Sequence, residues 1–207
     1  MKTSNLPKKQ IELWKKLARV TKIADFYLAG GTALALNFNH RESIDFDFFT
    51  AKSFDNHGLA KSFSKSGNFQ IDSLTENTLL GAIDGIKVSF FKYPYSSLQK
   101  PEKLEGLTVA SLADLAAMKV IAISQRGARR DFVDLYFIME SGFSIGELLQ
   151  LTKDKMSDLN ISETHLLKSL VYFEDAILDP MPKMKVQVSW EQMTAKITKA
   201  VTNYLRG

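Results

Sequence analysis

The hydrophobic pattern of this 207-residue chain changes from strand-like to helix-like near Gly106. Before that point, short apolar segments alternate with glycine-containing turns, which is typical of strands in a mixed or antiparallel sheet. After it, apolar residues recur every three to four positions, which is typical of one face of a helix. The pattern predicts an α+β chain with an α/β domain over residues 1–105 and an all-helical domain over residues 106–207.

The composition excludes several classes of protein. Hydrophobic residues make up 45% and charged residues 24% of the chain, which excludes a disordered or fibrous protein. No cysteine is present, so disulfides, thiolate metal sites and a cysteine nucleophile are excluded. The longest nearly apolar stretch, residues 115–123, is too short to span a bilayer, and the N-terminus lacks the apolar core of a signal peptide. We therefore expect a cytoplasmic protein with no membrane partner.

Individual elements can be predicted from periodicity and from turn and cap residues. In the first part we expect helices, strands and a hairpin that turns at Asp84-Gly85. The helices are expected over 6–23, from 32 and over 55–66, and the strands over 26–29, 44–48, 78–83 and 86–91. In the second part, helices are expected over 111–126, 129–140, from 144, over 162–178 and up to 206 from a cap at Ser189.

Gly30 and Gly31 lie between a predicted strand and a predicted helix. Glycine at this position lets the backbone approach a ligand closely, and the N–H groups at a helix start can bind phosphate. The hydroxyl of Thr32 could add to such a site. A glycine pair before a helix is also common for packing or turn reasons alone, so this motif is weak evidence by itself.

Asp45 and Asp47 lie two positions apart in a predicted strand, so both carboxylates leave the same face. Two adjacent carboxylates repel unless a cation lies between them, and Mg²⁺ prefers such oxygen ligands together with phosphate oxygens. The alternative is a solvated edge strand. The apolar residues Ile44, Phe46 and Phe48 argue against that alternative, because they predict that the opposite face is buried.

The second part of the chain carries a further group of charged residues. Lys119 lies in an apolar helical stretch, where it either reaches water or meets an anion. Arg126, Arg129 and Arg130 cluster around Gly127, where a loop can present them to phosphate. Asp131 and Asp134 share a face at the start of the next helix, where acidic residues are also favourable for electrostatic reasons alone.

Together these motifs resemble a known family of enzymes. Gly30-Gly31-Thr32 followed by Asp45-x-Asp47 is similar to the nucleotidyltransferase superfamily that includes DNA polymerase beta. Residues 28–36, 40–49, 115–122 and 126–136 resemble the AbiEii/AbiGii-type nucleotidyltransferase toxin family. The resemblance covers about residues 26–138. It implies a nucleotidyltransferase-like mixed sheet with helices, followed by a helical half that completes the active-site cleft.

The resemblance also implies an activity and roles for individual residues. The activity is Mg²⁺-dependent transfer of NMP from an NTP to an acceptor, either RNA such as tRNA or a protein, by the toxin of a toxin–antitoxin pair. The nucleotide-binding residues would be Gly30, Gly31, Thr32, Arg41, Arg126 and Arg130. The catalytic residues would be Asp45, Asp47, Lys119, Asp131 and Asp134, of which Asp45 and Asp47 bind magnesium. Arg41 could equally pair with Glu42 or Asp45.

One position departs from the wider superfamily, which usually has a third carboxylate on a later strand. Ser89 stands where we expect it. Asp72, in the strand-like stretch that begins at Phe69, is the only other candidate. This departure favours a single metal ion and motivates the alternative of an inactive domain that binds nucleotide, RNA or a protein. Tyr93, Tyr95 and Tyr136 could stack on a base, although packing is the commoner role of such residues.

Overall fold

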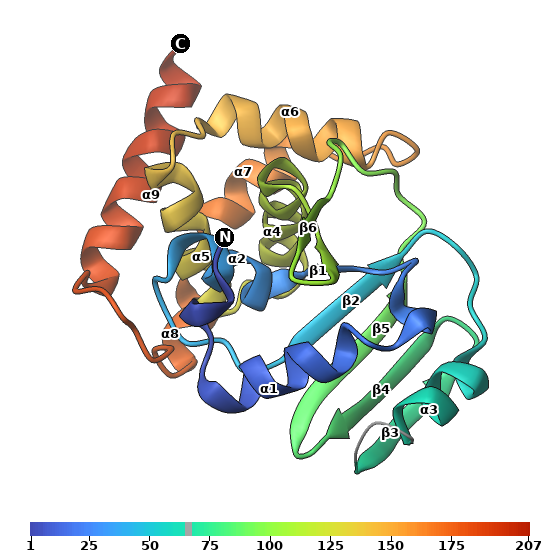
Figure 1. The fold of residues 1–207 in the computed structure, drawn as a ribbon. Coiled ribbons are helices and arrows are strands. Elements are labelled where there is room, and N and C mark those ends of the chain that lie inside the picture. The colour runs from blue at the N-terminus through green and yellow to red at the C-terminus, as the bar shows by residue number, and fades with distance from the viewer. Residues whose placement is uncertain (65–67) are drawn as a thin grey trace. The chain divides into compact units, whose positions relative to one another are not determined.

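The structure is a computed structural model that describes residues 1–64 and 68–207. The chain divides into two compact units, Met1–Ser111 and Leu112–Gly207 (Figure 1). All strands in the described part of the chain belong to the first unit, and the second is helical. The predicted α+β class, with a mixed sheet followed by helices, is confirmed.

The first unit contains a mixed sheet with the strand order β3-β4-β5-β2-β1-β7-β6. Its strands are β1 Tyr27–Ala29, β2 Phe46–Thr50, β3 Phe69–Thr75, β4 Thr78–Ile83, β5 Ile86–Lys92, β6 Glu102–Leu104 and β7 Leu107–Val109. Its helices are α1 Lys8–Leu17, α2 Gly30–Phe38 and α3 Asn56–Ser64, with 3₁₀ turns at Thr3–Asn5 and Thr21–Ile23. The helix predicted over 55–66 corresponds to α3, and its last two residues lie outside the described residues.

The central strands bring distant parts of the sequence into register. β2 pairs antiparallel with β1 and parallel with β5. The β4–β5 hairpin turns at Asp84 and Gly85, which have φ values of 52° and 80°. Positive φ at both central residues of a two-residue loop is the geometry of a type I′ turn, which Asp-Gly favours. The predicted hairpin is therefore confirmed.

One face of the sheet forms an aromatic core. Phe46, Phe48 and Phe90 are at most 1% exposed, and the rings of Phe48 and Phe90 stack 5.1 Å apart. Trp14 of α1 lies 6.2 Å from Phe46, and Phe63 of α3 lies 5.0 Å from Phe90. These contacts place α1 and α3 on the same face of the sheet, as Figure 1 also shows. The side chains between them in sequence, including Asp47, therefore point to the opposite face.

Two expectations about this part of the fold are wrong. Ile44 is 58% exposed, because β2 begins only at Phe46 and the predicted alternation does not extend back to residue 44. The segment after Gly106 begins with the strand β7 rather than with a helix. β6 and β7 have only three residues each, too short for a periodic signal, and turn at Glu105 and Gly106, both with positive φ.

The second unit consists of six helices in the described residues. They are α4 Leu112–Arg126, α5 Arg129–Glu140, α6 Ile145–Lys155, α7 Glu163–Leu170, α8 Glu174–Leu178 and α9 Trp190–Arg206. The single helix predicted over 162–178 is wrong, because residues 171–173 interrupt it. The capping boxes at Ser144 and Ser189 are both present, with Glu147 and Gln192 as partners. Each box satisfies backbone N–H groups that a helix start leaves without a helical partner.

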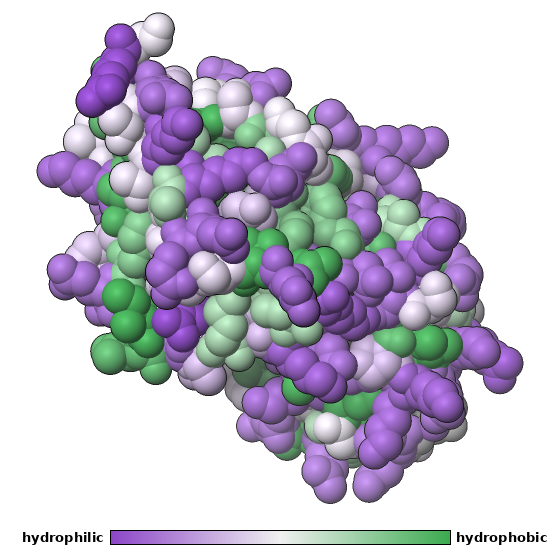
Figure 2. Space-filling view, turned by 90° about the vertical axis from the view of Figure 1, so that its left-hand side faces the viewer, coloured by the Kyte–Doolittle hydropathy of each residue, from purple (hydrophilic) through white to green (hydrophobic). Residues whose placement is uncertain are grey.

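No helix in the described ranges combines the length and apolarity that a membrane crossing needs. The face of the molecule in Figure 2 is mostly hydrophilic, with hydrophobic residues in small separate patches.

Phe48→Ala should lower the free energy of unfolding by about 3–5 kcal/mol, because it opens a cavity among the stacked rings. Leu178 is 85% exposed, so Leu178→Ala should change stability by less than about 0.5 kcal/mol. Urea denaturation followed by circular dichroism measures both values. Equal losses in the two variants would show that the aromatic core does not stabilise this fold.

Candidate active site

The turn from β1 into α2 lies directly against an acidic side chain. Gly30 has a φ of +68°, and a Cβ atom there would lie 2.9 Å from Oδ2 of Asp47. A Cβ atom at Gly31 would overlap Nη2 of Arg41 and lie 3.2 Å from the Ser43 hydroxyl. Gly30 is therefore strained with any other residue because of its positive φ, whereas a Cβ at Gly31 would force the Arg41 side chain to shift.

Thr32 has a different position from the one expected for a residue that contacts phosphate. It is 1% exposed, and its hydroxyl lies 2.9 Å from that of Ser43. The same hydroxyl donates a hydrogen bond to the backbone carbonyl oxygen of Asp45. Thr32 thus ties the start of α2 to the segment that carries Asp45, and a direct contact with phosphate stays a prediction.

Asp45 immediately precedes β2, and Asp47 is its second residue. Both residues are half-buried, and Asp45 lies two residues before Asp47, just outside the strand. Asp47 pairs with Ala29 of β1 on one side and Ser89 of β5 on the other. Ser89 therefore lies beside Asp47, where the sequence comparison places the missing third carboxylate.

Asp72 does not supply that carboxylate. It lies in the edge strand β3, at a register irregularity between Ile71 and Ser73, and is exposed. Three strand spacings separate β3 from β2, which amounts to about 14 Å. No cluster of three or more His, Cys, Asp or Glu residues suited to a metal occurs among the residues that the structure describes. Asp45 and Asp47 are thus the pair that could hold a cation, and their carboxylates would suit Mg²⁺ with phosphate oxygens completing its coordination.

Two polar residues that the sequence analysis did not assign join this site. Ser43 lies against Gly31 and Thr32. Lys87 directly precedes Val88, the partner of Phe46, so it is on the Asp47 face beside Asp45, and it is exposed. Arg41 is 5% exposed and donates a hydrogen bond to the Glu42 carbonyl oxygen. The position of Lys87 in this site follows only from the pairing register of β2 and β5. Ser43 could have been predicted from its spacing of two residues from Asp45.

The second unit contains a buried network of charges. Nζ of Lys119 lies 2.8 Å from Asp131 and 2.9 Å from Asp134. Arg126 donates to both oxygens of Asp131, at 2.8 and 3.0 Å. The side chains of both aspartates are fully buried and that of Lys119 is 6% exposed, whereas that of Arg126 is 54% exposed. The fold thus brings four of the predicted residues together, and Arg126 is the member that reaches the surface.

This network controls the protonation of Asp131. Burial alone raises the pKa of its carboxyl, but the positive charge of Lys119 and the hydrogen bond from Arg126 outweigh burial, so the pKa lies below its usual value. Asp131 therefore holds its negative charge firmly. Arg130 is exposed and takes no part in the network of described residues.

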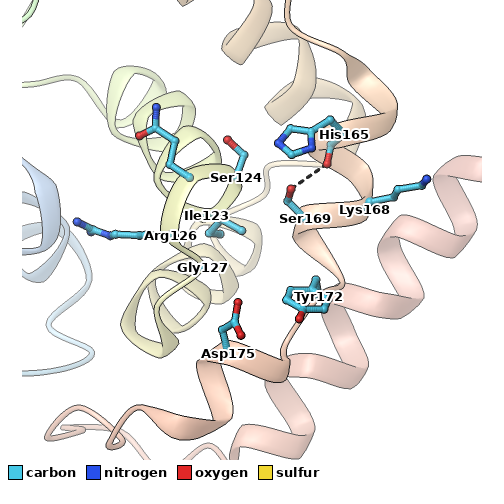
Figure 3. A pocket seen from close by; sticks show the side chains of 10 residues that line it. Ile123, Ser124, Arg126, Gly127, His165, Lys168, Ser169, Tyr172 and Asp175 are labelled. Carbon is cyan, nitrogen blue, oxygen red and sulfur yellow. Dashed lines mark hydrogen bonds between the residues drawn. The ribbon is translucent and has the colours of Figure 1, made fainter.

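A cavity of about 360 Å³ lies within the second unit, between the end of α4 and the α7–α8 segment (Figure 3). Of the predicted site residues, Arg126 alone contributes to its lining in the described chain. His165 and Ser169 of α7 face Ser124 across it, and Asp175 points toward Gly127. The pocket is therefore polar on both walls.

Gly30→Ala should lower the free energy of unfolding more than Gly85→Ala does. Both variants bear the cost of a positive φ, about 1–2 kcal/mol, but only at residue 30 does the new Cβ meet another group, the carboxylate of Asp47. Combining Gly30→Ala with Asp47→Ala should remove the excess loss. Equal losses in the two single variants, measured by urea denaturation, would contradict the contact with Asp47.

Asp131→Asn should lower the free energy of unfolding by about 3–5 kcal/mol near pH 7, because it removes one partner from a buried charge network. The lowered pKa means that Asp131 contributes stability above its unfolded pKa of about 3.9, and that this is lost as pH falls through the folded value. The loss of stability below about pH 4 should thus be shallower in the variant than in the wild type.

Asp84→Asn is the matched control for this change, because Asp84 forms an exposed pair with Lys16 and asparagine also suits its turn. Its effect should stay within about 1 kcal/mol. Denaturation curves measured from pH 3 to pH 7 would contradict the role of Asp131 if the two variants behaved alike.

One family model matches this chain. Residues 12–105 and 84–205 match the family described as "Nucleotidyl transferase AbiEii toxin, Type IV TA system". An uncharacterized protein of Aquifex aeolicus (strain VF5) is 40% identical over 205 residues, which cover 97% of this chain and 98% of that protein.

Two solved structures share the fold at low sequence identity. JHP933 from Helicobacter pylori has a TM-score of 0.61 and 18% identity, covering 97% of this chain and 94% of that one. MenT4, a nucleotidyltransferase toxin from Mycobacterium tuberculosis H37Rv, has a TM-score of 0.60 and 16% identity, covering 92% and 80%. The family match spans almost the whole sequence and confirms the resemblance and the enzyme class: the chain belongs to the AbiEii nucleotidyl transferase toxin family.

Proposed function

We propose that this enzyme transfers a nucleoside monophosphate from an Mg²⁺-bound NTP to an acceptor and releases pyrophosphate. The observation that carries the proposal is the contact between the Gly30 turn and Asp47, with Asp45 two residues away. A helix start that binds phosphate and a carboxylate pair that binds Mg²⁺ are thereby adjacent. A magnesium ion bound there would neutralise phosphate charge and orient the NTP.

The residues around the turn are suited to bind the leaving group. Backbone N–H groups of Gly30 and Gly31 lie at the start of α2, and Arg41 and Ser43 lie against Gly31. Lys87 adds a second positive charge on the same face as Asp47. In phosphoryl transfer the protein supplies mainly positioning and charge stabilisation, and these residue types provide both.

The charged network of the second unit contains one cation that could take part in the reaction. Arg126 is the exposed cation, and Asp131 fixes its guanidinium, so Arg126 is suited to meet phosphate. Lys119 is bound by two buried carboxylates and is better suited to hold this network in place. Asp131 has a lowered pKa and accepts a proton poorly, which disfavours it as the general base. We propose that the acceptor hydroxyl loses its proton to water instead.

The biological setting follows from the family. We propose that the enzyme is the toxin of a toxin–antitoxin pair, that its acceptor is RNA such as tRNA or a protein, and that it acts in the cytoplasm with a separate antitoxin. MenT4 is named as a nucleotidyltransferase toxin, which supports this reading. A specific observation favours one alternative, an inactive domain that only binds nucleotide or a partner, because Ser89 lies where a third carboxylate is expected.

Asp45→Asn and Asp47→Asn should each reduce transfer by at least about a hundredfold, because each removes a charged ligand of the metal. The assay incubates purified protein with Mg²⁺, each of the four labelled NTPs in turn, and total cellular RNA, and follows label on RNA and on protein. Asp72→Asn is the control, since it removes an exposed carboxylate three strands away and should leave transfer unchanged. Chelation of Mg²⁺ should abolish transfer.

The assay also separates the two candidate functions. Wild-type transfer with one preferred NTP, lost in both site variants and kept in the control, would establish the activity and name the donor. Wild-type protein that binds Mg²⁺–NTP but transfers no label to RNA or protein would instead establish the inactive binding domain.

A further inference from the structure

The sheet face that carries Asp47 is polar toward the start of β2 and aromatic toward the end of β2. Toward the start of β2 lie the glycine turn and the polar residues Arg41, Ser43 and Lys87. Toward the end of β2 lies an aromatic row, which consists of Tyr27, Phe49, Phe91, Tyr93 and Tyr95. Asp47 lies between these two sides.

The strand register and ring contacts define the aromatic row. Tyr27, Phe49 and Phe91 are directly paired across β1, β2 and β5, with ring centroids 6.1 and 5.3 Å apart. Tyr93 extends the row 5.6 Å from Phe49, and Tyr95 follows at 4.7 Å. Phe49 is two residues beyond Asp47, so it lies about 7 Å further along the same face.

The aromatic row is only partly covered. Tyr27 is buried, whereas the other four rings are half-buried and keep part of their surface outside the core. The face that packs against α1 and α3 has its own aromatic core, in which Phe46, Phe48 and Phe90 are at most 1% exposed. The row is thus additional to the residues that form that core.

The geometry of the proposed reaction indicates which substrate lies beside the aromatic row. In transfer, the acceptor oxygen bonds to the α-phosphorus as the bond from that phosphorus to the bridging oxygen of pyrophosphate breaks, and the acceptor proton passes to water. The attacking and leaving oxygens lie roughly in line. If the leaving pyrophosphate lies at Gly30, Gly31 and Arg41, the acceptor approaches from the opposite side of Asp47, where the aromatic row lies.

We infer that the aromatic row binds the terminal unpaired nucleobase of an RNA acceptor. Aromatic rings stack on unpaired bases of any sequence, which is how proteins commonly hold single-stranded RNA. This inference rests on the proposed function and chooses RNA over protein as the acceptor. Tyr93 and Tyr95 are its outermost members and follow the end of β5, so they can be changed with the least effect on the sheet.

The test measures binding of a short RNA with an unpaired 3′ end by fluorescence anisotropy, without NTP or Mg²⁺. Tyr93→Ala should weaken binding about five- to tenfold, as expected for the loss of one stacking contact. Tyr93→Phe should keep wild-type affinity because it keeps the ring. Tyr204→Ala, on α9 and 38% exposed, is the control and should also bind as the wild type does.

An RNA that lacks only its terminal base identifies the group that is bound. Removing the base should weaken binding to the wild type as much as Tyr93→Ala does, and it should have no further effect on that variant. Independent, additive losses would overturn the stacking contact. Weaker binding of the NTP, with unchanged binding of RNA, would overturn the inference by assigning the row to the donor base.

The transfer reaction provides a second readout. Tyr93→Ala should raise the KM for RNA while leaving the KM for NTP unchanged. Label found on protein alone, with RNA neither bound nor modified, would overturn the inference without contradicting nucleotidyl transfer. Because the binding assay uses neither metal nor NTP, its result is independent of whether the enzyme transfers label at all.

Discussion

The candidate site depends on the contact between the Gly30 turn and the carboxylate of Asp47. A glycine with positive φ and no Cβ lets the end of β1 and the start of α2 approach that carboxylate closely. The antiparallel pairing of β1 and β2, in which Ala29 faces Asp47, fixes this approach. Thr32 ties α2 to the backbone of Asp45, so the glycine turn is also linked to the segment that carries both carboxylates.

In the second unit, buried charged residues hold an exposed positive charge in position. Lys119, Asp131 and Asp134 are buried together, so each charge needs the others to offset the loss of water. Their positions orient Arg126 at the surface, where its guanidinium can act on a ligand. The most exposed residue of this network is thus the one best placed for binding, and the buried ones hold it.

Local signals predicted the parts of the fold that local chemistry determines. The Asp84-Gly85 turn and the box at Ser189 were predictable because each depends on a few adjacent residues. The exposure of Ile44 and the β6–β7 hairpin could not be predicted in this way. Both depend on which strands lie alongside these residues in the sheet. The same limit applies to the site. The spacing of Asp45 and Asp47 marked a shared face, but the position of Lys87 required the β2–β5 register.

We propose above that the glycine turn and the carboxylate pair form one Mg²⁺–NTP site. Calorimetric titration of a non-hydrolysable NTP analogue tests it most directly, with and without Mg²⁺, on the wild type, Asp47→Asn and Gly31→Ala. We expect Mg²⁺-dependent binding that is lost in Asp47→Asn and weakened in Gly31→Ala, where the new Cβ displaces Arg41. Binding of equal strength in all three proteins, with or without Mg²⁺, would contradict it.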